Sequence, residues 1–166
     1  MPIVTIDPIL LPMSRSEEIR YVVRNRRARR DYEIGNRFEA GIELMGSEVK
    51  SIREGKVNLS DAYAVVEEGQ VILKNLHINP YKMTTQDNHE PLRPRRLLLH
   101  KREIRKLYSQ TEQRGKTLIP LALYFKGKLV KIELALAVGR KKYDKRQAIA
   151  KAETDRSIRK ALRKDL

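Results

Sequence analysis

The sequence has no cysteine and no tryptophan, and aromatic residues make up only 5% of its 166 positions. Without cysteine, the chain cannot carry a disulfide framework, a thiolate zinc site or a cysteine nucleophile. It has no apolar run that approaches the ~18 residues needed to span a membrane. Residues 1–13 are interrupted by Pro2, Pro8 and Pro12 and lack both a basic start and a small-residue cleavage site, which argues against a signal peptide. We therefore expect a cytoplasmic protein.

Positive charge is what the chain holds in excess. Lysine and arginine total 36 against 21 aspartate and glutamate residues, which gives a net charge of +15. Residues 138–166 hold 11 basic and 4 acidic side chains, and five of the seven residues from Arg24 to Arg30 are arginine. Two basic segments therefore flank a better balanced middle. This distribution favours a polyanionic partner.

The middle of the chain alternates between helical and strand periodicity. Helices are predicted over residues 47–54 and 101–114, each followed by a glycine. Two hairpins are predicted over residues 62–73 and 118–138, each with a glycine in its turn. In residues 129–138, large apolar side chains alternate with charged or small ones, which is the period of a half-buried strand. Several short strands with two helices indicate a small antiparallel barrel or sandwich.

The segment after Gly139 breaks the strand pattern. Residues 140–166 are rich in alanine and lysine and contain few large apolar side chains, so a helix there would have little to pack against. We expect this tail to be disordered alone and helical when bound to a partner. The predicted organisation is an N-terminal extension at residues 1–23, a barrel domain at residues 24–138 and a basic C-terminal tail at residues 139–166.

The sequence offers no constellation for catalysis or for a cofactor. Its three histidines, His77, His89 and His100, are 12 and 11 positions apart and fall in different predicted elements, so they predict no metal site. There is no phosphate-binding glycine loop and no serine nucleophile elbow. We expect no enzymatic activity, no metal and no cofactor. A nuclease whose acidic residues gather from distant positions stays open as an alternative, which metal-dependent cleavage would reveal.

The basic segments favour nucleic acid over a merely solvated surface. The five guanidinium groups within Arg24–Arg30 repel one another unless counter-charge is near, and arginine suits bidentate phosphate contacts and stacking on bases. Residues 91–102 place five basic side chains around a three-leucine run at 97–99. This pattern predicts a buried strand with a basic face, and such an apolar anchor can hold a rigid basic surface. Tyr143 lies among lysines and arginines, where its ring either stacks on a base or is exposed on a solvated helix. Charge alone does not decide between DNA and RNA.

Five strings of the sequence occur together in a known family. They are Phe38–Leu44, Gly46–Gly55, Asn58–Tyr63, Asn88–Lys101 and Tyr143–Arg146. With these strings in family order from about Asn25 to the C-terminus, the sequence resembles the SmpB family, the SsrA-binding proteins of bacterial trans-translation. Residues 1–23 fall outside the pattern. Residues 82–86 depart from it, because the family has a glycine-containing loop there.

The resemblance implies a fold and a function. The fold is mainly β, an oligonucleotide-binding-type antiparallel barrel with packed helices. The function is that of an RNA-binding adaptor, which binds the tRNA-like domain of transfer-messenger RNA (tmRNA) and brings it to stalled ribosomes for peptide tagging and ribosome rescue. Alanyl-tRNA synthetase and elongation factor Tu would be indirect partners, through tmRNA. The tail would enter the empty mRNA channel beside the ribosomal RNA of the decoding region.

The resemblance also implies RNA-binding residues in the barrel domain. Glu39, Leu98 and His100 fall at family positions for tmRNA recognition. Glu39 would accept a hydrogen bond from a base edge or a ribose hydroxyl, or orient a neighbouring arginine. His100 would stack on a base or bond a ribose, and Leu98 would pack on a base or only support the surface. The residues that would contact backbone phosphates are Asn25, Arg26, Arg27, Arg95, Arg96, Lys101 and Arg102.

Further family positions lie in the tail. Gly139 matches a hinge ahead of it, and glycine tolerates the backbone angles that a hinge needs. Tyr143 matches an aromatic or histidine position that is expected to stack in the ribosomal decoding region. The other tail positions that would face the ribosome are Lys141, Lys142, Asp144, Lys145 and Arg146.

Two binding alternatives stay open. A generic single-stranded nucleic-acid-binding protein would show little preference for a folded tRNA-like RNA over plain single strands. A ribosome-associated protein held by ribosomal RNA alone would co-sediment with ribosomes without tmRNA. Binding would be strongly salt dependent in either case.

Overall fold

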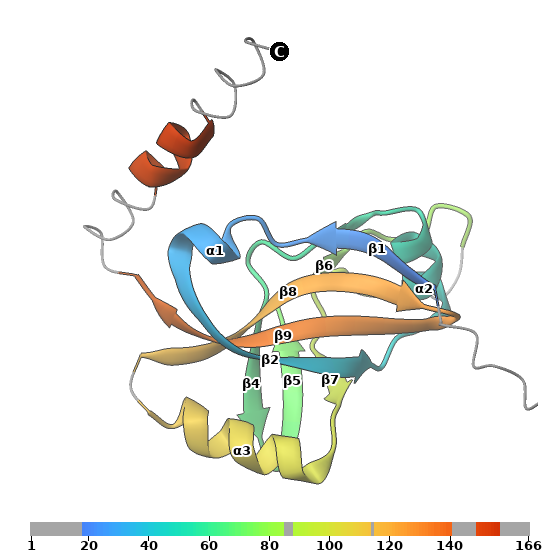
Figure 1. Cartoon of the computed structure of the whole chain (residues 1–166). Helices are drawn as coiled ribbons and strands as arrows, with labels where there is room; N and C mark the ends of the chain where they lie inside the picture. The colour runs from blue at the N-terminus through green and yellow to red at the C-terminus, as the bar shows by residue number, and fades with distance from the viewer. Residues whose placement is uncertain (1–17, 85–87, 114, 141–148, 157–166) are drawn as a thin grey trace, which may run out of the picture.

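A computed structural model describes residues 18–84, 88–113, 115–140 and 149–156 of the chain (Figure 1). Its elements in chain order are β1 (Ile19–Arg24), α1 (Ala28–Asp31), β2 (Tyr32–Ile42), α2 (Gly46–Arg53), β3 (Val57–Asn58), β4 (Tyr63–Glu67), β5 (Gln70–Lys74), β6 (His77–Ile78), β7 (Arg95–Leu98), α3 (Lys101–Thr111), β8 (Lys116–Lys126) and β9 (Leu129–Gly139). Residues 149–156 form a further helix. Each pairing between these strands is antiparallel.

Six strands close into a ring. From β8 the order runs through β4, β5, β7, β2 and β9, and β9 pairs again with β8. β1 adds to this ring by pairing with β8, from Ile19 opposite Lys126 to Arg24 opposite Ala122. β3 and β6 form a separate two-stranded sheet. Closure into a barrel removes the open edges that a flat sheet would expose to other chains.

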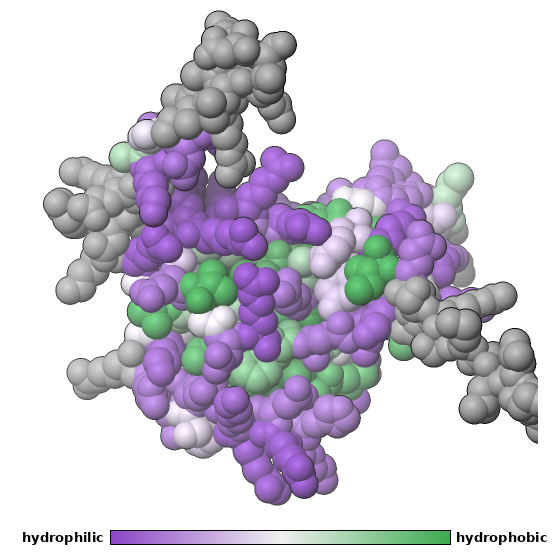
Figure 2. Space-filling view, in the orientation of Figure 1, coloured by the Kyte–Doolittle hydropathy of each residue, from purple (hydrophilic) through white to green (hydrophobic). Residues whose placement is uncertain are grey.

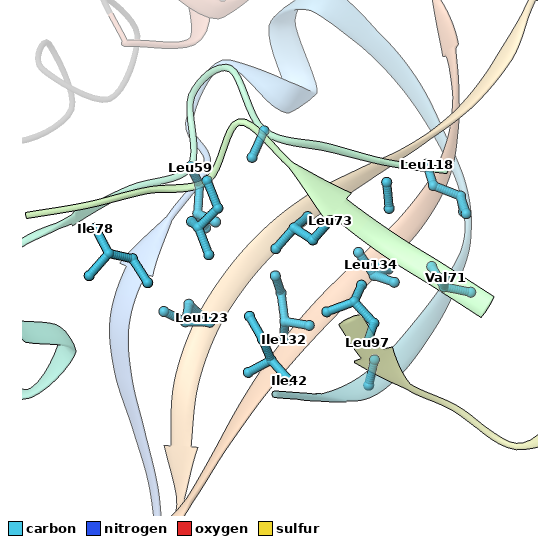
Figure 3. Close-up of a cluster of buried hydrophobic side chains, with 14 of the residues drawn as sticks. Ile42, Leu59, Val71, Leu73, Ile78, Leu97, Leu118, Leu123, Ile132 and Leu134 are labelled. Atoms are coloured by element: carbon cyan, nitrogen blue, oxygen red, sulfur yellow. The ribbon is translucent and has the colours of Figure 1, made fainter. Parts of the chain in front are cut away.

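The interior of the ring is filled by branched aliphatic side chains from several strands (Figure 3). Val71 and Leu73 of β5 and Ile132 and Leu134 of β9 are completely buried. In each strand these residues are two positions apart, so they point to the same side of the pleat. The predicted alternation within residues 129–138 is therefore confirmed at the centre of β9.

A second, smaller apolar cluster seats α1 on the barrel. Ala28 of α1 packs in it with Ala135 and Ala137, which lie on the outward face of β9. With these outward side chains covered, both faces of β9 are buried from Leu134 to Ala137. Ala28 thus anchors the basic segment Arg24–Arg30, whose arginines are exposed.

The predicted fold class is confirmed: the protein is a mainly antiparallel β barrel with packed helices. α2 and α3 are the two predicted helices, and β4–β5 and β8–β9 are the two predicted hairpins. In the β4–β5 turn, Glu68 and Gly69 have φ angles of 49° and 73°. Two consecutive positive φ angles are the geometry of a tight turn that matches strand twist, and glycine adopts them readily.

β1 forms where the sequence predicted no element. It includes residues 19–23, which the sequence assigned to the N-terminal extension, and it pairs with β8. Only Val22 and Val23 of this strand pack against the core, while Ile19 and Tyr21 are exposed. So short an apolar pattern gives no local signal, and the pairing depends on a strand about 100 residues away. The division into extension, barrel domain and tail stays a prediction.

The tail is described only in part. Gly139 ends β9 and residues 149–156 are helical, whereas Lys141–Arg146 lie outside the described residues. Disorder of the free tail therefore stays a prediction. None of the helices in the described ranges is long and apolar enough to cross a membrane.

Candidate nucleic-acid interface

The structure brings three predicted RNA-binding residues into one shallow hollow. Glu39 comes from β2, Leu98 from the end of β7 and His100 from the turn into α3. These three side chains line a hollow of about 430 Å³. Its other lining residues are Leu99, Glu103 and Lys131. Residues 39 and 98–100 are far apart in sequence, so the barrel assembles this hollow.

Strand alternation explains why Leu98 faces outward. Leu97 is buried in the core, and Leu98, one position later, is 52% exposed. Gly41 of β2 lies opposite Leu98 in the β2–β7 pairing. A Cβ atom at position 41 would lie 3.2 Å from the Leu98 Cβ. Glycine at that position thus leaves room for the exposed leucine.

The Glu39 carboxylate is held by two donors. The Tyr124 hydroxyl donates to Oε2 at 2.5 Å, and the Lys126 ammonium lies 3.2 Å from Oε1. The hydrogen bond from Tyr124 and the charge of Lys126 together hold the pKa of Glu39 below its ordinary value, against a smaller opposing effect of burial. Burial and the same hydrogen bond raise the pKa of Tyr124, so its hydroxyl stays a donor. Glu39 therefore presents an oriented acceptor at neutral pH.

His100 precedes the first turn of α3. Its backbone N–H donates to the Glu103 carboxylate at 3.0 Å, which satisfies one free donor of the helix start. The His100 side chain is exposed, and so are Lys101 and Arg102 on the first turn of the helix. Arg96 is exposed on β7, where its Nε donates to Glu43 at 2.8 Å. Exposed cationic side chains thus lie on β7 and on the first turn of α3, next in sequence to residues that line the hollow.

The Asn25 side chain makes its hydrogen bonds inside the fold. Its amide nitrogen donates to the carbonyl oxygens of Leu59 at 3.3 Å and Pro120 at 3.1 Å. Its amide oxygen accepts from the backbone N–H of Ala28 at 3.2 Å. Because the amide is used inside the fold, Asn25 positions the start of α1. Its phosphate contact stays a prediction.

Arg95 departs from the prediction. Its side chain is fully buried, and a guanidinium nitrogen lies 2.7 Å from a carboxylate oxygen of Glu48, which is fully buried as well. Further donors of Arg95 reach the carbonyl oxygens of Leu76, Arg93 and Pro91. A buried guanidinium with its donors occupied cannot reach an RNA phosphate. The structure therefore contradicts the predicted phosphate contact of Arg95.

Glu48 is the centre of this buried ion network. Burial alone would raise its pKa, but hydrogen bonds from Arg93, the Met45 backbone and Arg95 outweigh burial and hold the pKa of Glu48 below its ordinary value. Arg93 reaches both carboxylate oxygens, at 2.9 and 2.5 Å. The network joins α2 to the segment that leads into β7 and so supports the strand that carries Leu98.

The arginines of the α1 segment form a second cationic area. Arg26 and Arg27 are exposed beside the buried Ala28. In Figure 2, hydrophilic side chains gather over α1 and over α3, with an apolar band over the strands between them. α1 lies at the start of β2 (Figure 1), whereas Glu39 is the eighth of the eleven residues of β2. The predicted RNA-binding residues therefore fall into two areas and not one.

The sequence prediction missed three residues that shape the hollow. Tyr124 and Lys126 hold Glu39, and Lys131 lines the hollow. All three lie on the outward face of the β8–β9 hairpin, which bears polar side chains. The alternation of inward and outward side chains along these strands is the sequence signal that could have indicated them. Their approach to Glu39 depends on strand pairing that no local pattern specifies.

Of the predicted tail residues, only Gly139 is described. It pairs with Tyr32 at the end of the β2–β9 ladder, and a Cβ atom there would meet nothing within 4 Å. Its function as a hinge stays a prediction. The remaining predicted tail residues, Lys141, Lys142, Tyr143, Asp144, Lys145 and Arg146, lie outside the described part of the chain. Within the described ranges, histidine and acidic side chains form no group that could hold a metal ion.

The chain is similar to known proteins along most of its length. The family model described as SmpB protein matches residues 22–164. An SsrA-binding protein of Halothermothrix orenii is 55% identical over 147 residues, which cover 89% of this chain and 95% of the relative. An SsrA-binding protein of Carboxydothermus hydrogenoformans is 55% identical over 142 residues, which cover 86% of this chain and 95% of the relative.

A solved structure shares the fold. A chain of the structure described as "tmRNA-SmpB: a journey to the center of the bacterial ribosome" is 46% identical, with a TM-score of 0.62. The match covers 76% of the present chain and 93% of the other. Sequence and fold agree, and the chain belongs to the SmpB family.

Proposed function

We propose that this protein is an RNA-binding adaptor that binds the tRNA-like domain of tmRNA and brings it to stalled ribosomes for trans-translation. The observation that carries the proposal is the single hollow that Glu39, Leu98 and His100 share. Family membership supports it, as does the relationship to a protein solved with tmRNA at the ribosome.

The hollow reads RNA through a few oriented groups. Tyr124 and Lys126 keep Glu39 ionised and aligned, so its carboxylate accepts a hydrogen bond from a base edge or a ribose hydroxyl. The exposed Leu98 offers apolar surface to a base, and His100 offers a ring for stacking. The phosphate contacts come from Arg96 on β7, from Lys101 and Arg102 on the first turn of α3, and from Arg26 and Arg27 at α1.

The tail, residues 139–166, senses the empty mRNA channel. It becomes ordered along ribosomal RNA only where no message occupies the channel, because ordering loses entropy that the contacts must offset. Gly139 is the hinge, and Tyr143 stacks in the decoding region. The other contacts come from Lys141, Lys142, Asp144, Lys145 and Arg146.

The protein acts by binding and not by catalysis. Alanyl-tRNA synthetase and elongation factor Tu engage through the bound tmRNA, and the process takes place in the cytoplasm.

Competition binding tests the proposal. Labelled tRNA-like domain of tmRNA is bound at fixed physiological salt and challenged with excess tRNA, single-stranded RNA and duplex DNA. We expect selective binding, which Glu39→Ala weakens about tenfold or more, the effect of a lost hydrogen bond to a charged group. The matched control is Glu67→Ala, since Glu67 is an exposed, ion-paired glutamate on β4.

Two outcomes would contradict the proposal. Equal competition by every polyanion would mean that charge alone holds the RNA, as in a generic nucleic-acid-binding protein. Equal loss of affinity in the Glu39 and Glu67 variants would mean that the hollow has no special role.

A further inference from the structure

β1 carries a stack of three side chains on the outside of the barrel. The Arg24 guanidinium lies over the Tyr21 ring, 3.9 Å from its centroid. The Tyr21 ring in turn lies against the Tyr124 ring, with centroids 5.3 Å apart and an angle of 51° between the planes. Tyr21 is still 48% exposed, and Arg24 is exposed. The stack therefore holds a planar cation at the surface.

This stack forms one wall of a cationic groove of about 440 Å³. Tyr21 and Arg24 line it together with the arginines at positions 26 and 29 of the α1 segment and Arg37 of β2. Arg156 of the helix at residues 149–156 also lines it. Among the described lining residues the only acid is Glu133, and Arg37 already lies 3.2 Å from it. The groove thus has a large excess of positive charge.

The positive charge of the groove and the flat face of the Arg24 guanidinium, stacked on Tyr21, together indicate the class of ligand. Several guanidinium groups around one hollow favour an anion with multiple oxygens, and arginine meets phosphate in a bidentate manner. A guanidinium that is already stacked on a ring keeps its outer face flat, and bases stack on such a face. An acidic peptide would satisfy the charge but would leave this planar surface unused.

We propose that this groove is a second RNA subsite that holds one unstacked nucleotide. The base stacks on the Arg24–Tyr21 pair, and the adjoining phosphates bind Arg26 and Arg29. The subsite rests on the proposed RNA-binding function but shares no lining residue with the Glu39 hollow. It gives a role to Tyr21, which precedes the residues 22–164 that the family model matches.

The test separates stacking from charge in the full-length protein. The probes are a short fluorescein-labelled single-stranded RNA and the same RNA with abasic ribose at its central positions. Arg24→Lys keeps the charge but removes the plane, so it should weaken binding of the base-containing RNA by about fivefold or more and leave the abasic probe unaffected. Tyr21→Ala should have a similar effect, and Tyr21→Phe should behave as wild type.

Arg20→Lys is the matched control. Arg20 lies on the same strand, is exposed and also lies over a ring, 5.0 Å from the Phe125 centroid, but it does not line the groove. In NMR titrations with the base-containing RNA, the Arg24 Nε–H resonance should shift and the Arg20 resonance should not.

Three results would overturn the subsite: wild-type affinity of the Arg24→Lys protein for both probes, equal losses in the Arg24 and Arg20 variants, or equal losses for both probes. These outcomes are distinct from failure of the proposed function, which the Glu39 competition assay reports with a different RNA and a different hollow.

Discussion

At the scale of single residues, the pair Glu48–Arg95 shows why a buried charge must keep its partner. Both side chains are fully buried, and their charged atoms lie 2.7 Å apart. Arg95→Met should lower the free energy of unfolding by about 3–5 kcal/mol, because it leaves the Glu48 carboxylate buried with only part of its compensation. Urea denaturation followed by circular dichroism measures this loss.

The double variant Glu48→Gln/Arg95→Met controls for the shape of the new side chain. It should recover part of the lost stability, since no buried charge is left unpaired. If Arg95→Met were as stable as wild type but lost RNA affinity, the side chain would act at the surface and its buried position would be irrelevant to function.

Tyr124 controls the pH at which the Glu39 carboxylate becomes protonated. The hydrogen bond from Tyr124 is the main cause of the lowered pKa of Glu39. In Tyr124→Phe the pKa of Glu39 should rise toward its ordinary value. On acidification Glu39 should therefore become protonated at a higher pH than in wild type, and RNA affinity should be lost at that higher pH. NMR titration of the Glu39 side-chain carboxyl carbon reads the change directly.

Tyr63→Phe is the matched control, because Tyr63 is an exposed tyrosine on β4 outside the hollow. Identical Glu39 titration midpoints in wild type and Tyr124→Phe would show that the hydroxyl does not govern this carboxylate.

At the scale of elements, α1 depends on Asn25 for its position. Asn25→Ala removes two hydrogen bonds to the carbonyl oxygens of Leu59 and Pro120, and a third that the Asn25 amide oxygen accepts from the backbone N–H of Ala28 at the helix start. Unsatisfied, partly buried groups cost about 1–3 kcal/mol, so stability and RNA affinity should fall together. Thermal unfolding and RNA titration of the same sample measure both quantities.

Arg26→Ala is the contrasting variant, because Arg26 is exposed and should lose RNA affinity with little change in stability. An Asn25→Ala protein with wild-type stability and reduced affinity would contradict this structural role and favour a direct phosphate contact of Asn25.

Sequence patterns predict some of these elements but not the contacts between them. Helices and hairpins whose apolar periodicity is strong, such as β9, were predictable because their pattern is local. The burial of Arg95 was readable from β7, where Arg95 and the buried Leu97 are two positions apart, but positive charge pointed to the surface. The meeting of Glu39 with Tyr124 was not readable, because it depends on which strands are neighbours.

At the scale of the whole molecule, body and tail should separate by function. A protein truncated after Gly139 keeps the closed barrel and the Glu39 hollow, so it should bind the tRNA-like domain of tmRNA about as tightly as the full chain. It should fail to support peptide tagging on stalled ribosomes. Filter binding and a reconstituted tagging reaction measure the two activities.

A matched control restores a tail of the same length and net charge with its residues in scrambled order. Tagging by the truncated protein would show that the tail is dispensable, and tagging by the scrambled protein would show that its charge suffices.

The long strand β9 sets a distance that the molecule cannot easily change. Lys131 lines the hollow near the start of β9 and Gly139 ends the strand at the origin of the tail, which at ~3.3 Å per residue gives a span of at most ~26 Å. β9 is paired on both sides, with β2 and β8, so an inserted or deleted residue would shift two ladders at once. The distance between the hollow and the start of the tail is therefore set by the length of β9. We expect relatives to differ in length beyond residue 139 or in the loops, and not within this strand.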